Sequence, residues 1–332
     1  MTRTSLEALE RELGVDAVTV EARLNGDDVA LSEPLVAAVE QYEAVVGTRD
    51  PYLWHWLSAI FPLFRLSCVP TASHDRVLEQ KVLLTMFITL LDDVAERDGD
   101  RATFEEARKV PFPAEQVDTD RDDVDGELVE FAQWLWDRLE EGLRAAPRYE
   151  EFVHVLRFDL RQALNAIDYS LLVNECLDVA TLGGCEQYDV HNMVVFSYVD
   201  IDLLHSPDFD RRDNGELREA VWDAQMMARI GNWVTTWERE LGEGDYSSGI
   251  VVYALRNGIV DIDELRGDEP TVEELADRIR NHGVEEYFLT EWETRYGGLK
   301  AGRLDAHSVD LDAFVEGMRR VMAYHLASRG KK

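Results

Sequence analysis

The sequence predicts an all-α fold. Apolar residues recur at spacings of three and four over several long stretches, whereas the strict apolar–polar alternation of strands is rare. Breakers such as Asp50-Pro51, Val69-Pro70 and Ser206-Pro207 fall between these stretches. The predicted helices span 5–24, 35–46, 128–143, 152–173 and 222–241.

The same pass along the chain predicts a single domain. No internal repeat, low-complexity tract or long linker separates the 332 residues. We therefore expect one all-α domain over 1–332, with N-terminal helices at 1–48, a bundle core at 49–305, and a C-terminal helix and tail at 306–332.

Composition excludes several classes of partner. The chain has 34 Lys and Arg against 67 Asp and Glu, a formal charge of −33, so no nucleic-acid partner is expected, because such binding depends on basic side chains. The longest apolar run, 82–91, is about half the length of a membrane span. The three cysteines are too scattered for a disulfide framework or a thiolate zinc site. A cytoplasmic protein is expected.

A carboxylate cluster follows this longest apolar run. Asp92, Asp93 and Glu96 lie on one face of the last helical turns at about 100° per residue. Three carboxylates on one face repel each other unless cations neutralise them, and oxygen ligands suit Mg²⁺. Such a string arises by chance roughly once or less in a chain this acidic. Its position directly after an apolar helix therefore carries the prediction.

A second and rarer motif lies farther along the chain. Asn232, Thr236 and Glu240 stand at i, i+4 and i+8, which places an amide, a hydroxyl and a carboxylate on one helix face. This pattern is expected by chance only roughly 0.06 times in such a chain. Arg229 and Arg239 flank the same face, and guanidinium groups beside metal-binding carboxylates suit a diphosphate.

With these two motifs the sequence resembles the class I terpene synthases, specifically their compact single-domain bacterial type. That family carries an aspartate-rich motif, here Asp92 to Glu96, and an Asn/(Ser,Thr)/Glu motif roughly 140 residues later, with a basic residue before its Glu, here Arg239. Many members also have a C-terminal Arg-Tyr pair, which Arg295-Tyr296 matches. The resemblance covers about residues 50 to 300.

The resemblance implies an antiparallel helical bundle around a central apolar pocket. It also implies Mg²⁺-dependent ionisation of a linear or bicyclic prenyl diphosphate, followed by carbocation cyclisation and release of diphosphate. Three Mg²⁺ ions are expected, with Mn²⁺ as a substitute: two on the aspartate-rich motif and one on the second motif. Arg229, Arg239, Arg295 and Tyr296 would contact the diphosphate, and the family's members are often homodimers.

One departure from the family pattern concerns the trigger of ionisation. Members usually have a sensor Arg about 46 residues before the motif Asn, near a helix break. Position 186 is Glu here, and no Arg occurs between Arg161 and Arg211. Gly183-Gly184 matches the break, and Arg229 is the candidate replacement for the sensor.

Substrate length and reaction type remain open at this stage. Small residues beneath the aspartates, Thr85 and Thr89, favour a C20 substrate, geranylgeranyl diphosphate, over a C15 substrate. The alternatives are a chain-elongating prenyl diphosphate synthase and a catalytically inactive, terpene-synthase-like binding protein. Aromatic side chains that either line the pocket or pack the core are Trp54, Trp56, Phe61, Phe64, Phe196, Tyr198, Trp222 and Trp233.

Overall fold

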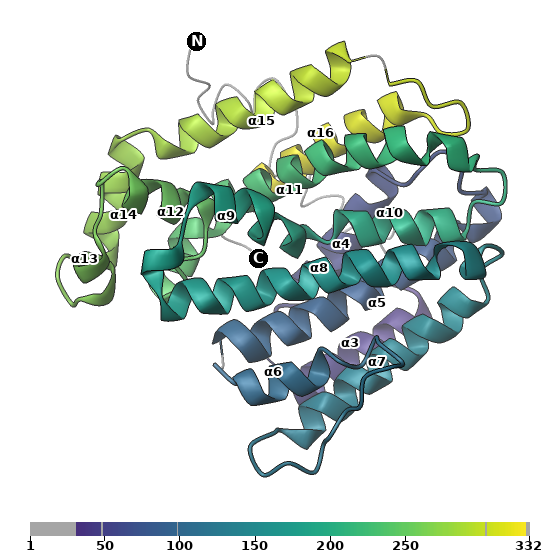
Figure 1. Cartoon of the computed structure of the whole chain (residues 1–332), viewed down its shortest axis with the longest axis horizontal. Coiled ribbons are helices and arrows are strands. Elements are labelled where there is room, and N and C mark those ends of the chain that lie inside the picture. Colours follow the sequence, from purple (N-terminus) through teal and green to yellow (C-terminus); the bar gives the residue numbers. More distant parts are fainter. Residues whose placement is uncertain (1–30, 48, 98, 303, 330–332) are drawn as a thin grey trace.

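The computed structural model describes residues 31–47, 49–97, 99–302 and 304–329 (Figure 1). All regular structure in these ranges is helical, which confirms the all-α prediction. The α-helices are α3 (Glu33–Val45), α4 (Tyr52–Ile60), α5 (His74–Asp92), α6 (Arg101–Ala107), α7 (Gly126–Arg144), α8 (Tyr149–Glu175), α9 (Leu182–Gln187), α10 (Val195–Leu204), α11 (Asn214–Glu243), α12 (Gly249–Arg256), α13 (Ile262–Arg266), α14 (Val272–Asn281), α15 (Val284–Ala301) and α16 (Leu311–Ala327). Short helical turns, mostly 3₁₀, connect them: η2 (Phe61–Leu63), η3 (Thr71–Ser73), η5 (Leu177–Val179), η6 (Asp189–Met193) and η7 (Arg211–Asp213), with a π-helical turn η4 (Asp93–Arg97).

Four of the five predicted helices fall on α3, α7, α8 and α11, and the fifth, 5–24, lies outside the described residues. The ends of α3, α7 and α8 agree closely with the sequence pattern, whereas α11 begins at Asn214 rather than at 222. Local chemistry fixes several ends. The Asp125 side chain accepts hydrogen bonds from the first backbone amides of α7. Gly244, at φ 82°, ends α11 in the left-handed conformation that glycine adopts most readily.

The helix break lies after Gly183-Gly184 rather than at this pair. Both glycines belong to α9, and a Cβ on Gly184 would stand 2.1 Å from the Tyr169 hydroxyl, so close packing requires glycine there. The chain turns instead through η6 to Val194, whose φ of 58° is rare for a β-branched residue. This turn directs α10 back through the core, where all ten of its residues are buried.

The helices pack around a central set formed by α5, α8, α10 and α11 (Figure 1). Helix α5 packs against α7, α8 and α10, and α11 packs against α10, α15 and α16. At Gly231 a Cβ would stand 3.0 Å from the Met322 sulfur, so this glycine brings α11 close to α16. The packing places α5 and α11, which carry the two motifs, on walls of the same interior space. No helix in the described part of the chain is long and apolar enough to cross a membrane.

Candidate active site

A cavity of about 230 Å³ opens between α4, α5, η6, α10, α11 and α16. Its mouth is polar and carries most of the residues of the two sequence motifs. The motif residues and the flanking arginines that line it are Asp92, Glu96, Arg229, Asn232, Thr236, Arg239 and Glu240. Its deeper wall is apolar and includes Leu57, Ile60, Phe61, Phe64, Val321 and Tyr198. Two segments about 140 residues apart in the sequence thus meet at one opening.

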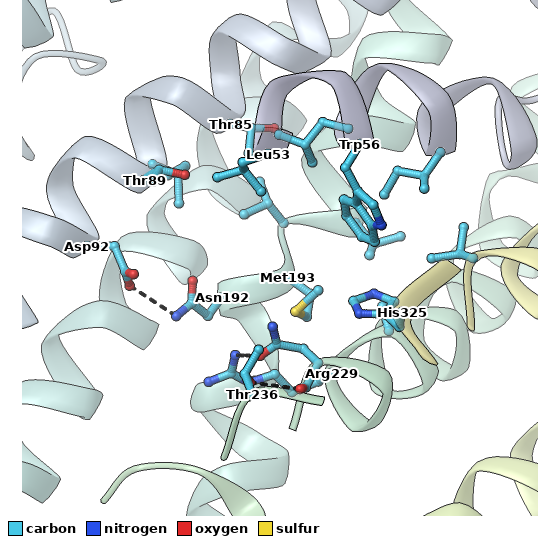
Figure 2. Close-up of a pocket in the computed structure, with 18 of the residues that line it drawn as sticks. Leu53, Trp56, Thr85, Thr89, Asp92, Asn192, Met193, Arg229, Thr236 and His325 are labelled. Atoms are coloured by element: carbon cyan, nitrogen blue, oxygen red, sulfur yellow. Dashed lines mark hydrogen bonds between the residues drawn. The ribbon is translucent and has the colours of Figure 1, made fainter. Parts of the chain in front are cut away.

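On one wall, Asp92 ends α5 and Glu96 follows in the π-helical turn. The Asn192 side chain, from η6, donates to Asp92 Oδ1 at 3.3 Å (Figure 2). A guanidinium nitrogen of Arg49 lies 3.9 Å from Asp92 Oδ2. Within the described residues, Glu96 Oε1 is buried without a hydrogen-bond partner, so this oxygen is available to a ligand.

The structure differs from the sequence prediction at Asp93. This side chain does not line the cavity. It accepts a hydrogen bond of 3.1 Å from the Tyr42 hydroxyl and three from Arg49, the shortest at 2.7 Å. The physical reason is its position, about 100° around the helix from Asp92, which turns it toward α3. Asp93 therefore anchors the segment between α3 and α4 to the end of α5.

On the opposite wall, α11 presents the second motif. The Thr236 hydroxyl donates a hydrogen bond to the Asn232 carbonyl oxygen at 2.8 Å, which leaves the lone pairs of the hydroxyl oxygen free to bind a cation. The Asn232 side-chain oxygen accepts from Arg229 at 2.8 Å, and Glu240 lies one turn after Thr236. The i, i+4, i+8 spacing thus places all three motif side chains at the mouth.

Two guanidinium groups accompany this motif. Arg229 forms a bidentate pair with Asp189, at 2.7 and 2.6 Å, and Asp189 is fully buried. Arg229 is thereby held rigidly at the cavity wall, one turn before Asn232 (Figure 2). Arg239 also lines the mouth but is more exposed and donates to Glu243 at 2.6 Å.

The carboxylates at the mouth are only partly compensated by the nearby arginines. Burial, with the nearby charges of Asp93 and Asp245, raises the pKa of Asp92 to about 6. Burial and the charge of Asp245 raise the pKa of Glu240 to about 7, and burial raises that of Glu96 well above its usual range. A cation between them would relieve this repulsion.

Asp245 and Arg49 are site residues that the motif search missed. Asp245 lines the mouth just beyond the end of α11, and its Oδ1 accepts from the Asn174 side chain and the Ser247 amide, both at 2.9 Å. Arg49 precedes α4 and lies far from either motif in sequence. Neither residue stands three, four or seven positions from a motif residue on the same helix, so helical periodicity does not predict that they reach the cavity.

The structure does not bring the Arg295-Tyr296 pair to the cavity. Arg295 donates to Asp223 at 2.8 Å, and the Tyr296 hydroxyl donates to Glu316 at 2.9 Å. Neither side chain lines the mouth, because this face of α15 is directed toward α11 and α16 rather than toward the cavity.

The donor set at the mouth fits divalent cations of the Mg²⁺ type. Among the described residues, no three His, Cys, Asp or Glu side chains are gathered closely enough to hold an ion alone. Mg²⁺ is bound in proteins by one or two carboxylates together with substrate phosphates and water, so a complete protein cage is not required. The orphaned Glu96 oxygen is free to bind such an ion, and the raised pKa values of Asp92, Glu96 and Glu240 mark carboxyls whose ionised form a bound cation would stabilise.

The aromatic candidates divide into two groups. Those that line the cavity are Trp56, Phe61, Phe64 and Tyr198. Those that pack elsewhere are Trp54, Phe196, Trp222 and Trp233. Thr85 and Thr89 line the cavity on α5 as the sequence predicts.

Comparisons with known proteins give the fold. No family model matches the sequence, and no curated protein matches it. The structure is similar to the crystal structure of linalool/nerolidol synthase from Streptomyces clavuligerus in complex with 2-fluorogeranyl diphosphate, with a TM-score of 0.51 and 12% sequence identity. The match covers 98% of this chain and 99% of that one. The chain therefore has the helical fold of a terpene synthase.

Proposed function

We propose that this chain is a class I terpene synthase that ionises a prenyl diphosphate with the help of Mg²⁺ and cyclises the resulting carbocation. One observation carries the proposal. The carboxylates of α5 and η4 and the amide–hydroxyl–carboxylate face of α11 line opposite walls of one polar mouth above an apolar cavity. A diphosphate head and a hydrocarbon tail need these two environments side by side.

In this proposal Asp92 and Glu96 hold two Mg²⁺ ions on one wall, and Asn232, Thr236 and Glu240 hold a third on the other. Mn²⁺ is an expected substitute. The bound ions would neutralise the charge that develops on the departing diphosphate. The catalytic role predicted for Asp93 becomes a positioning role, because its carboxylate holds Arg49 and Tyr42.

Arg229 is proposed to replace the missing sensor. Its guanidinium lines the cavity, and Asp189 and Asn232 fix its orientation. A guanidinium held in advance at the place where negative charge develops lowers the barrier without reorganisation in the reaction. Arg239 would contact the same diphosphate from the rim. Arg295 and Tyr296, which are held by other side chains away from the cavity, are left out of this assignment.

The apolar wall would then handle the carbocation. The rings of Trp56, Phe61, Phe64 and Tyr198 line the cavity, and aromatic faces attract cations by about 0.5–2 kcal/mol each. Exclusion of water keeps the cation from being quenched before it cyclises. The same proposal places the whole chain, 1–332, in one catalytic domain that works in the cytoplasm, alone or as a homodimer.

The test is incubation of the purified protein with C10, C15 and C20 allylic diphosphates and a bicyclic C20 diphosphate, with Mg²⁺ and with EDTA. Extracts are analysed by gas chromatography–mass spectrometry. A cyclic hydrocarbon or alcohol that forms only with Mg²⁺, and that Asp92→Ala and Asn232→Ala both abolish in folded protein, supports the proposal.

Two other outcomes would replace it. Longer prenyl diphosphates that form only when a C5 diphosphate is added would identify a chain-elongating enzyme. If folded protein turns over none of these substrates but Mg²⁺ and inorganic pyrophosphate together raise its Tm, the chain is a binding protein, because a ligand stabilises only a state that binds it.

A further inference from the structure

The deep end of the cavity is closed by a hydrogen-bonded floor. Four of its lining residues make up what we call the floor cluster: Phe61, Phe64, Thr85 and Tyr198. The Thr85 hydroxyl donates to the Lys81 carbonyl oxygen at 2.8 Å, so its single proton is used there. The 2.8 Å hydrogen bond between Thr85 and Tyr198 therefore has the Tyr198 hydroxyl as its donor. This bond ties the Tyr198 ring of α10 to α5 at the level of Thr85, where both residues line the cavity.

The aromatic members of the floor cluster pack edge to face. The Phe61 ring centroid lies 4.7 Å from that of Tyr198 and 5.8 Å from that of Phe64. Phe64 in turn contacts Phe314 of α16, at 6.5 Å between centroids. All four rings are almost completely buried. A longer hydrocarbon chain cannot pass between these rings without moving them.

Behind the floor lies a buried ion pair that opposes such movement. The Lys81 ammonium contacts Asp202 at 2.9 Å, and neither side chain reaches solvent appreciably. The Leu66 amide also donates to Asp202, at 3.0 Å, and the Lys81 nitrogen lies 5.1 Å from the Phe64 ring centroid. A hydrocarbon that displaced Phe64 would disturb a charge pair that has no water to replace its contacts. The floor cluster therefore resists displacement by a longer hydrocarbon chain.

The distance from the mouth to this floor is short. Asp92 and Thr85 line the cavity seven residues apart on α5, which is roughly 10 Å at 1.5 Å per residue (Figure 2). Lys81, one turn deeper, is fully buried and does not line the cavity. An extended five-carbon isoprenoid unit spans about 5 Å of carbon chain. Two units therefore fit extended, and a third can fold toward the wall that carries Trp56 and His325.

We infer that the floor cluster limits the substrate to a C10 or C15 allylic diphosphate. This inference rests on the proposed function and deepens it. The inferred substrate is shorter than the C20 diphosphate that the small side chains of Thr85 and Thr89 favour on sequence grounds. Thr85 is small, but the space beneath it is occupied by Tyr198, which is hydrogen-bonded to its hydroxyl. A C20 chain would have to fold back on itself within the same depth.

The test measures binding, so that it does not depend on turnover. The full-length protein with Mg²⁺ is titrated calorimetrically with the C10, C15 and C20 S-thiolodiphosphates, which ionise very slowly. The wild-type protein is expected to bind the C15 analogue at least about tenfold more tightly than the C20 analogue. Tyr198→Ala, which opens the floor, is expected to reduce this ratio to about threefold or less. Tyr198→Phe keeps the ring and should keep most of the ratio.

Two further variants make the test decisive. Phe152→Ala removes an equally buried ring that packs on Phe209, away from the cavity, and should leave the ratio unchanged. If Tyr198→Ala does not fold, Phe61→Leu makes a smaller opening in the same floor and should lower the ratio in the same direction. An unchanged ratio in a folded floor variant overturns the role of the floor cluster.

The outcomes also separate this inference from the proposed function. Wild-type protein that binds the C20 analogue as tightly as the C15 analogue overturns the length limit and leaves the terpene synthase proposal standing. Protein that binds none of the three analogues in the presence of Mg²⁺ overturns both.

Discussion

Replacement of Glu240 by Gln is expected to stabilise the metal-free protein at alkaline pH and much less at acidic pH. In the folded protein this carboxyl lines the cavity mouth, with only 16% of its side chain exposed. Burial and the charge of Asp245 raise its pKa from 4.5 to about 7. Gln keeps the shape of the side chain and carries no charge at any pH.

The magnitude follows from this pKa difference. Because the folded-state pKa lies above the unfolded value, the protonated carboxyl favours the folded state. This contribution is complete below about pH 4.5 and is lost as the pH rises through about 7. A difference from 4.5 to about 7 corresponds to about 3 kcal/mol. Glu240→Gln should therefore exceed the wild type in unfolding free energy by about 3 kcal/mol at pH 8, and by less than about 1 kcal/mol at pH 5.

The assay is urea unfolding followed by circular dichroism at both pH values, with EDTA and with excess Mg²⁺. Added Mg²⁺ should raise the unfolding free energy of the wild type at pH 8 and that of the variant by less, since one ligand is gone. Glu219→Gln, an exposed residue on the same helix, removes the same charge and controls for the high net charge of the chain. An equal shift at both pH values, or a shift that Glu219→Gln reproduces, would refute the reasoning.

Three other predictions use the same unfolding assay. Arg229→Met leaves Asp189 buried without its partner and should lower the unfolding free energy by about 3–5 kcal/mol, most of which a second change, Asp189→Asn, should restore. Arg295→Gln removes an ion pair remote from the cavity, so it should change the unfolding free energy by about 1 kcal/mol or less and leave the affinity for pyrophosphate and Mg²⁺ at the wild-type value. A large loss of that affinity would show that Arg295 contacts the diphosphate after all. Gly317→Ala should cost about 1–3 kcal/mol because its Cβ would stand 2.1 Å from a backbone carbonyl oxygen of η2, whereas Gly297→Ala, with open space around it on α15, should be neutral or slightly stabilising.

Periodicity predicted the long helices because their core faces repeat over many turns. Helix α8 was predicted over 152–173 and spans Tyr149–Glu175. The break was placed wrongly at Gly183-Gly184, since glycine in a sequence does not distinguish a bend from a tight contact. Here Gly184 gives room to the Tyr169 hydroxyl, and the chain turns at Val194, a residue whose propensity argues against a positive φ.

The site was predictable where its residues share a helix and not where they meet across the fold. Asn232, Thr236 and Glu240 lie on one face by spacing alone, and the structure places that face at the cavity. Asp245 lies beyond the helix end, and its direction depends on hydrogen bonds to another helix. The Arg295-Tyr296 pair shows the converse, because a two-residue string carries no information on which way α15 turns it.

The arrangement of charge at the mouth explains why so few of its groups are neutralised within the protein. Arg229 is paired with Asp189, and Arg49 with Asp93, and neither of these two carboxylates lines the cavity. The carboxylates that do face the cavity have weaker arginine contacts, at 3.9 Å for Asp92 and 3.7 Å for Glu240, and their pKa values are raised. When ionised, the five carboxylates that line the mouth outnumber its three arginines. A diphosphate approaching such a mouth alone is repelled, whereas divalent cations are attracted and then reverse the local field. In the proposed enzyme, cations would have to bind before or together with the substrate. Asp93 and Asp189 would hold the two arginines in place, so that the carboxylates facing the cavity remain available to bind the metal ions.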